Sequence, residues 1–223
     1  MHQRKSKKIL IYFFLIIAVS SINNLSLHNL KFKNITDIKI FGLSKKENNI
    51  LFQEIKKMNL ENILFINKNE ISHLFDTNSL IEYYEVKKKY PSTIYVKIQK
   101  TSFFAKININ DEIFLIGSNG KLSPNDFQNK DLPFIFGKPD IKEFLNFKNV
   151  IDQSKFSYDQ IENLYFYPSK RWDLKLKSNI VLKLSKNPTK EYLNDLYEFL
   201  EQDNLEKFNI VDARLKNQII LNE

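Results

Sequence analysis

Residues 85–100, which read EVKKKYPSTIYVKIQK, decide the fold of the N-terminal half of this chain. They read as two strands that meet at Tyr90-Pro91. In the second strand apolar Ile94, Val96 and Ile98 alternate with polar residues, which is the period of a half-buried strand. Proline restricts φ to a value that suits a turn, so Pro91 fits the joint between the strands. The segment therefore predicts a β-hairpin that closes a small sheet.

The residues before this hairpin predict one strand and two helices. The strand is expected over residues 35–41. Ser44 and Glu47 then form a capping box, in which each side chain bonds a free backbone N–H at a helix start. Asn67 and Glu70 give a similar pattern before a second, shorter helix. Apolar residues at helical spacing follow in each helix, at Leu51, Ile55 and Met58 in the first and at Ile71, Leu74 and Phe75 in the second. The predicted order is β-α-α-β-β.

The rest of the chain, residues 101–223, predicts a mainly antiparallel β domain with flanking helices, so the fold class is α+β. Ser118-Asn119-Gly120 is typical of a hairpin turn. Helices are expected to start after the capping residues Asp140 and Thr189. The expected strands cover residues 103–107, 113–116, 163–167, 171–177, 180–184 and a final strand from 208 through 215 to 221.

The N-terminus has the features of a membrane signal. Four basic residues lie within positions 1–8, and a strongly apolar run covers residues 9–19. By the positive-inside rule the first eight residues form a cytoplasmic tail, a single transmembrane helix covers residues 9–27, and the rest is exported. The apolar run is shorter than the roughly 20 residues that span a bilayer. A signal peptide cleaved after Ala18-Val-Ser20 is therefore an open alternative.

Composition excludes several classes of function. The formal net charge is +8, yet only three of the 34 basic residues are arginines. This lysine bias, together with abundant Asn and Ile, indicates a solvated lysine surface, and we expect no nucleic-acid binding. The chain contains no cysteine, which excludes disulfides, thiolate metal sites and cysteine nucleophiles.

The sequence offers no constellation of catalytic residues. The four glycines are too dispersed for a phosphate-binding loop of the usual kind. Acidic pairs such as Asp111-Glu112 lie in predicted turns, without an apolar pocket that would raise a carboxyl pKa. The histidines share no metal-ligand spacing and lie at His2, His28 and His73. We therefore expect no catalytic residue, no cofactor and no metal, and we do not expect an enzyme.

A β-α-α-β-β module behind an apolar N-terminal segment resembles a POTRA domain, expected here over residues 33–100. The run from Val86 to Ile98 is similar to the closing hairpin of this domain in the FtsQ/DivIB family of bacterial division proteins. The following domain is similar to the β domain of that family in its order of elements. It carries Arg171-Trp172-x-Leu174-x-Leu176 before a hairpin, an amphipathic helix after it, and Val211-Asp212-x-Arg214 in the final strand.

The resemblance implies a non-enzymatic cell division scaffold of the inner membrane, located at the division septum. It implies a single-pass type II topology with the bulk of the chain in the periplasm. In the family the β domain binds FtsB, which travels with FtsL, and the assembly links early division proteins to septal peptidoglycan synthesis. The matching contact positions are Arg214, Leu215 and Asn217, and the expected strand edge extends through Gln218, Ile219 and Ile220.

Arg171 and Arg214, which lie in the two sequence motifs that resemble the family, have two interpretations. A planar guanidinium at Arg171 or Arg214 suits bidentate or stacked contacts with a partner, which an ammonium group does not make. Alternatively, each arginine pairs within the chain with a neighbouring carboxylate such as Asp173 or Asp212. Trp172 is expected in the core.

Two other classes of protein remain open. A POTRA-containing envelope assembly or secretion factor normally repeats the module and adds a barrel, for which 223 residues leave no room. A membrane-anchored exported enzyme is the other alternative. An assay of glycan turnover by the purified protein separates that enzyme from a scaffold.

Overall fold

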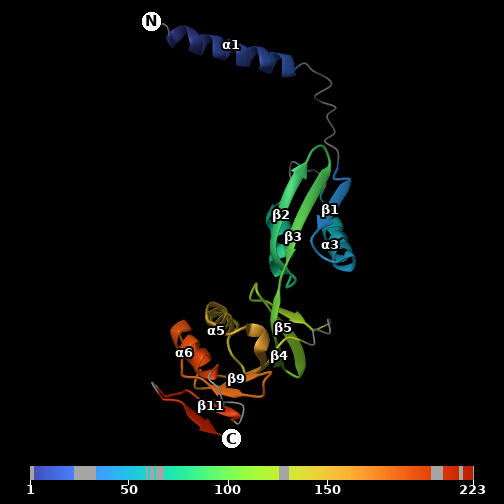
Figure 1. Ribbon diagram of the computed structural model, residues 1–223. Helices are drawn as coiled ribbons and strands as arrows, with labels where there is room; N and C mark the ends of the chain where they lie inside the picture. The colour runs from blue at the N-terminus through green and yellow to red at the C-terminus, as the bar shows by residue number, and fades with distance from the viewer. Residues whose placement is uncertain are drawn as a thin grey trace. The chain divides into compact units, whose positions relative to one another are not determined.

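The computed structural model describes residues 3–22, 34–58, 60, 63, 68–125, 131–201, 208–215 and 218–222 (Figure 1). The chain divides into two compact units. The first consists of Met1–Ile40, Lys45–Lys68 and Val86–Val96, and the second of Phe41–Ser44, Asn69–Glu85 and Lys97–Glu223.

The N-terminal helix α1 covers Gln3–Ile22. The large apolar side chains of residues 9–17 are all about half exposed or more. Among the helices that the structure describes, none combines the length and the apolarity needed to cross a membrane. Residues 23–27 of the expected transmembrane helix lie outside the described residues.

The predicted β-α-α-β-β order is confirmed. Its three-stranded sheet has the order β1-β3-β2. Ile94, Val96 and Ile98 of the central strand are at most 4% exposed, as their alternation predicts. Asn67, the expected cap of the second helix, lies outside the described residues. The elements are β1 Asp37–Phe41, α3 Lys45–Lys57, α4 Lys68–Thr77, β2 Ile81–Lys89 and β3 Thr93–Lys100.

The second sheet has nine strands in the order β12-β11-β10-β9-β8-β7-β4-β5-β6. Parallel pairs join β4 to β7, β7 to β8 and β10 to β11, and the other neighbouring strands are antiparallel. The strands are β4 Phe103–Ile109, β5 Glu112–Gly117, β6 Leu122–Pro124, β7 Phe134–Phe136, β8 Ile161–Phe166, β9 Trp172–Leu176, β10 Val181–Lys183, β11 Ile210–Asp212 and β12 Ile220–Asn222. The helices are α5 Ile141–Gln153 and α6 Lys190–Leu200, with the short 3-10 helix η1 Tyr158–Gln160.

Strand register separates two rows of side chains that run across this sheet. Residues directly opposite in neighbouring strands share a face, and the next residue along each strand points to the other face. The buried row consists of Ile135, Leu164, Leu174, Leu182, Val211 and Leu221. The outer row consists of Phe136, Tyr165, Asp173, Lys183, Asp212 and Ile220.

The core of the large sheet forms between the buried row and the helices α5 and α6 (Figure 1). Trp172 is 3% exposed, which confirms its expected place in the core. Its ring stacks on Phe147 of α5, with ring centroids 4.8 Å apart and planes 9° apart. The helices start where their caps predict, because Asp140 Oδ1 accepts from Lys142 N and Thr189 Oγ1 accepts from Tyr192 N.

The expected single final strand is wrong. Residues 208–221 instead contain two short strands, since β11 runs parallel to β10 and β12 returns antiparallel to β11. Strand β7 was not expected either. It has only three residues, which is too short for alternation to be recognised in the sequence.

The predicted turn at Asn119 also fastens two segments of the second unit together. Its Nδ2 donates to Ser79 O at 3.0 Å and to Ile81 O at 2.9 Å, while its Oδ1 accepts from Lys121 N at 3.0 Å. Nearby, the hydroxyl of Ser118 donates to Glu82 Oε2 at 2.6 Å. The Asn119 side chain thus satisfies two backbone carbonyls that are far from it in sequence.

Candidate partner-binding site at the C-terminal edge

Strand β12 forms one edge of the nine-stranded sheet. It pairs with β11 on one side, with Ile220 opposite Asp212 and Leu221 opposite Val211. It stands last in the strand order, so its other side has no neighbouring strand among the described residues. Such an edge presents backbone N–H and C=O groups to which a further strand can bind.

Apolar side chains lie exposed along this edge. Leu215 is 56% exposed and Ile220 is 41% exposed, while Ile219 is half-buried against the core. The predicted site residue Gln218 is exposed, and Asn217 lies outside the described residues. Arg214 and Leu215 precede the edge strand, and Ile220 begins it. The sequence predicted that these residues form one strand edge. The structure corrects this, because only Ile220 lies in β12.

A groove of about 570 Å³ lies beside these residues, between α6 and the C-terminal segment. Most of its walls are apolar or aromatic, with an acidic group at Asp195. Its lining includes Tyr192, Asp195, Leu196, Phe199, Ala213, Leu215, Gln218 and Ile219.

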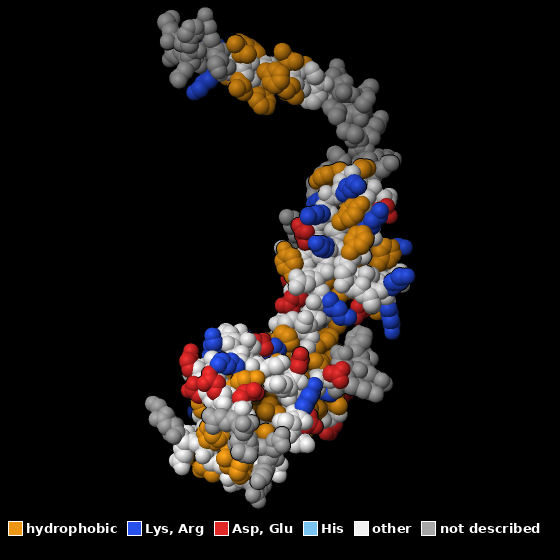
Figure 2. Space-filling model, in the orientation of Figure 1, with side chains coloured by type: hydrophobic (Ala, Val, Ile, Leu, Met, Phe, Trp, Pro, Cys, Tyr) orange, Lys and Arg blue, Asp and Glu red, His pale blue; other side chains and the backbone are white. Residues whose placement is uncertain are grey.

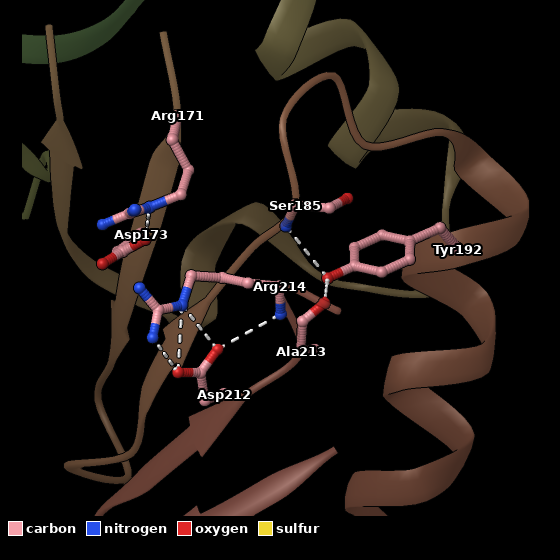
Figure 3. A network of polar contacts seen from close by, with 7 residues as sticks. All are labelled: Arg171, Asp173, Ser185, Tyr192, Asp212, Ala213 and Arg214. Carbon is pink, nitrogen blue, oxygen red and sulfur yellow. Dashed lines mark hydrogen bonds and ion pairs between the residues drawn. The ribbon is translucent and has the colours of Figure 1, made fainter. Parts of the chain in front are cut away.

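Tyr192 holds the C-terminal segment to α6, and sequence reasoning did not select it. Its hydroxyl donates to Ala213 O at 2.6 Å and accepts from Ser185 N at 3.1 Å (Figure 3). Burial raises the pKa of Tyr192, so the hydroxyl keeps its proton for this bond. The only sequence signal was its position three residues after the cap Thr189, which points to the first turn of a helix but not to this contact.

Both arginines of the candidate site pair with neighbouring carboxylates. Arg214 Nε donates to Asp212 Oδ1 at 2.7 Å, and its Nη2 also bonds Asp212 Oδ2 (Figure 3). Arg171 Nε donates to Asp173 Oδ1 at 3.1 Å, and its guanidinium lies over the Tyr167 ring with 4.4 Å to the centroid. The pairing within the chain is therefore the interpretation that the structure bears out.

These pairs still leave charge accessible on the outer face of the sheet. The Arg214 side chain is 44% exposed and that of Arg171 is 24% exposed, whereas Asp212 and Asp173 are mostly buried. Both carboxylates flank Lys183 in the outer row, which ends at Ile220. Within the part of the chain that the structure describes, the edge thus combines a strand side without a neighbouring strand, an exposed isoleucine and partly exposed guanidinium groups.

The Arg214 pair predicts a pH dependence of stability. The hydrogen bond from Arg214 lowers the pKa of Asp212 below its ordinary value of 3.8. A carboxyl whose pKa is lower when folded stabilises the fold above its unfolded pKa, and this stability is lost as pH falls through the folded pKa. Asp212→Asn should therefore cost about 1 kcal/mol at neutral pH, a small value because water screens the half-exposed Arg214.

Urea unfolding of both proteins measures this difference. The difference should shrink as pH falls through the pKa of folded Asp212, because the carboxyl is then protonated in both the folded and the unfolded state. A cost that stays the same as the solution is made more acidic would show that the carboxylate charge contributes nothing. Exposed Asp159→Asn serves as the control, since its side chain lies in η1, outside this pair.

The part of the chain that the structure describes holds no group of three His, Asp or Glu side chains placed to bind a metal ion. The C-terminal edge presents backbone groups of β12, exposed apolar side chains and the partly exposed Arg214 guanidinium.

Comparison with known families defines the class of this protein. A model described as the FtsQ-type POTRA domain matches residues 33–100, and a model described as the C-terminal part of the cell division protein FtsQ/DivIB matches residues 105–214. The chain is therefore a POTRA module followed by a division-protein β domain. It belongs to the FtsQ/DivIB family of cell division proteins, as its resemblance predicted.

Individual relatives carry the same description. Cell division protein FtsQ of Rickettsia bellii (strain RML369-C) is 26% identical over 174 residues, which cover 70% of this chain and 60% of that protein. Cell division protein FtsQ of Rickettsia prowazekii (strain Madrid E) is 30% identical over 135 residues, which cover 58% of this chain and 48% of that protein. The chain thus matches 60% of the length of the first relative and about half of the second. Arg214 is the last residue that the C-terminal family model matches, and residues 215–220 lie beyond it.

Proposed function

We propose that this protein is a non-enzymatic scaffold of the division septum, anchored in the inner membrane by residues 9–27. Its periplasmic domains bind the division proteins FtsB and FtsL and connect early division proteins to septal peptidoglycan synthesis. The observation that carries this proposal is the outer side of β12, which has no neighbouring strand among the described residues, with Ile220 exposed on β12 and Leu215 exposed before it.

The proposed mechanism is addition of a partner strand to β12. Main-chain hydrogen bonds to the side of β12 that faces away from β11 supply affinity, and alternate side chains supply specificity. Ile220 lies in the outer row next to Asp212, so a partner side chain opposite Ile220 covers this isoleucine. The guanidinium groups of Arg214 and Arg171 lie on the same face, where an acidic residue of the partner fits.

Depletion of the protein in its own cells tests this role. We expect filaments without completed septa, because a missing scaffold blocks constriction while growth continues. The tagged full chain, purified from membranes, should bring FtsB- and FtsL-like proteins with it. Normal division after depletion, or turnover of peptidoglycan by the purified chain, would contradict the proposal.

The proposed topology predicts the activity of reporter fusions. A reporter that works only outside the cytoplasm should be active when fused after Lys100 and inactive when fused after Lys8. A reporter that works only in the cytoplasm should give the reverse result. If the cytoplasmic reporter is active when fused after Lys100, the proposed membrane-anchored topology is wrong.

A further inference from the structure

The first compact unit concentrates positive charge around the turn between β2 and β3. Within residues 34–40 and 86–96 the only acidic residue is Asp37. The basic residues of the same segments are Lys39, Lys87, Lys88 and Lys89. Lys39, Lys87 and Lys89 are exposed.

Aromatic side chains lie among these lysines. Tyr95 lies on the central strand β3, between β1 and β2. Lys39 Nζ of β1 lies 5.7 Å from the centroid of its ring, and Lys89 Nζ of β2 lies 5.6 Å from it. Tyr90 at the turn is 60% exposed. Figure 2 shows lysine and hydrophobic side chains side by side on this part of the surface, with some acidic side chains near them.

The turn is held beside the point where the chain enters this sheet. Thr36 N and Asp37 N donate to Ser92 O at 3.0 and 3.3 Å, and the Thr36 and Ser92 hydroxyls lie 2.8 Å apart. Residues 23–35 connect α1 to this point. Even a fully extended chain from Ile22 to Thr36 spans roughly 50 Å, so the turn stays within about that distance of the end of α1.

We propose that Lys39, Lys87, Lys89, Tyr90 and Tyr95 bind the headgroups of anionic phospholipids at the membrane that holds α1. Ammonium groups pair with lipid phosphates, and basic residues next to a membrane anchor are attracted to an anionic surface. Tyrosine suits the same depth, because its ring is apolar and its hydroxyl is polar. This inference rests on the proposed membrane anchor. It adds a second membrane contact that fixes the orientation of the POTRA module.

Tryptophan fluorescence of the full chain in vesicles tests the contact. The chain has one tryptophan, Trp172, which is 3% exposed and serves as an internal reference. In a Tyr90→Trp variant the new indole reports on the turn. We expect a nitroxide-labelled headgroup lipid to quench its emission severalfold more in vesicles containing phosphatidylglycerol than in pure phosphatidylcholine. Salt at about 0.5 M should remove most of this difference, because it screens exposed charges.

Matched lysine variants separate charge recognition from simple proximity. Lys39→Gln, Lys87→Gln and Lys89→Gln combined should abolish the extra quenching in phosphatidylglycerol. The control combines Lys138→Gln, Lys142→Gln and Lys190→Gln, three exposed lysines of the second unit, and should retain it.

The contradicting outcomes are distinct. Quenching that is equal in both lipids, or that survives the triple variant, means that only the tether brings the turn near the membrane. A chain that floats with vesicles but shows no quenching overturns this inference alone. A chain that does not float with vesicles overturns the anchor as well. The emission of the Tyr90→Trp variant is also followed while a purified division protein is added. If it changes then but does not respond to phosphatidylglycerol, the lysine and tyrosine surface binds a protein partner and not lipid.

Discussion

Replacing Trp172 by alanine is expected to lower the free energy of unfolding by about 3–5 kcal/mol. The indole packs in the centre of the large sheet's core, where it stacks on Phe147 and lies against Phe166, with ring centroids 4.7 Å apart. Phe144 completes its aromatic surroundings at 6.3 Å. Removal of the ring leaves a cavity between α5 and β9 that neighbouring rings on two rigid elements do not fill.

Urea unfolding followed by circular dichroism measures this loss, since the variant lacks the only tryptophan. Trp172→Phe should cost much less than the alanine variant, because it keeps a ring against Phe147. Phe136→Ala provides a surface control of similar chemistry, as Phe136 is 45% exposed. A loss below about 1 kcal/mol for Trp172→Ala would mean that this site collapses without a cavity.

The elements with strong periodicity could be predicted from sequence. The hairpin of β2 and β3 follows from the alternation of Ile94, Val96 and Ile98 together with Pro91, and the structure places all three apolar residues in the interior. The starts of α5 and α6 follow from Asp140 and Thr189, because an N-cap is a local interaction.

Elements that depend on long-range pairing could not be predicted. Strand β7 has three residues and exists because β4 and β8 pair with it on either side. The return of the chain into β12 likewise depends on pairing with β11, and residues 208–221 carry no Gly or Pro to mark a turn.

The candidate site could be predicted in part. The short spacing of Asp212 and Arg214 allowed a local ion pair, which the structure contains. The bond from Tyr192 to Ala213 joins residues far apart in sequence, so no local pattern indicates it. The position of Asn119 indicated its turn, whereas its bonds to Ser79 and Ile81 depend on tertiary structure.

Ile220→Lys is expected to weaken binding of an FtsB-like partner by at least tenfold, which corresponds to about 1.4 kcal/mol. When a strand adds to β12, a side chain of that strand lies about 5 Å from position 220. An isoleucine there is covered by apolar contact, whereas a lysine places a charge between the two strands. Lysines on edge strands are a common means by which proteins block such pairing. The change should leave the fold intact, because Ile220 is 41% exposed in the free protein.

Ile113→Lys is the matched control for this variant. Ile113 is 42% exposed, almost the same as Ile220, and it lies in β5 opposite Asn108 of β4. Both variants make the same chemical change at equally exposed strand positions of one sheet, so they should show similar unfolding curves. Only Ile220→Lys should lose the partner in a titration with the purified periplasmic part of that protein.

Cysteine cross-linking locates the contact independently of affinity. Because the chain has no cysteine, Ile220→Cys and Ile113→Cys each introduce a single thiol. Partner variants with one cysteine at successive positions should cross-link to position 220 at a single register, with alternate partner residues reacting strongly and weakly. This period of two is the signature of an added strand, since successive side chains point to opposite faces. Reaction at a spacing of three and four residues would instead indicate that the partner binds as a helix, and the strand-addition mechanism would then be wrong even if Ile220 is at the interface.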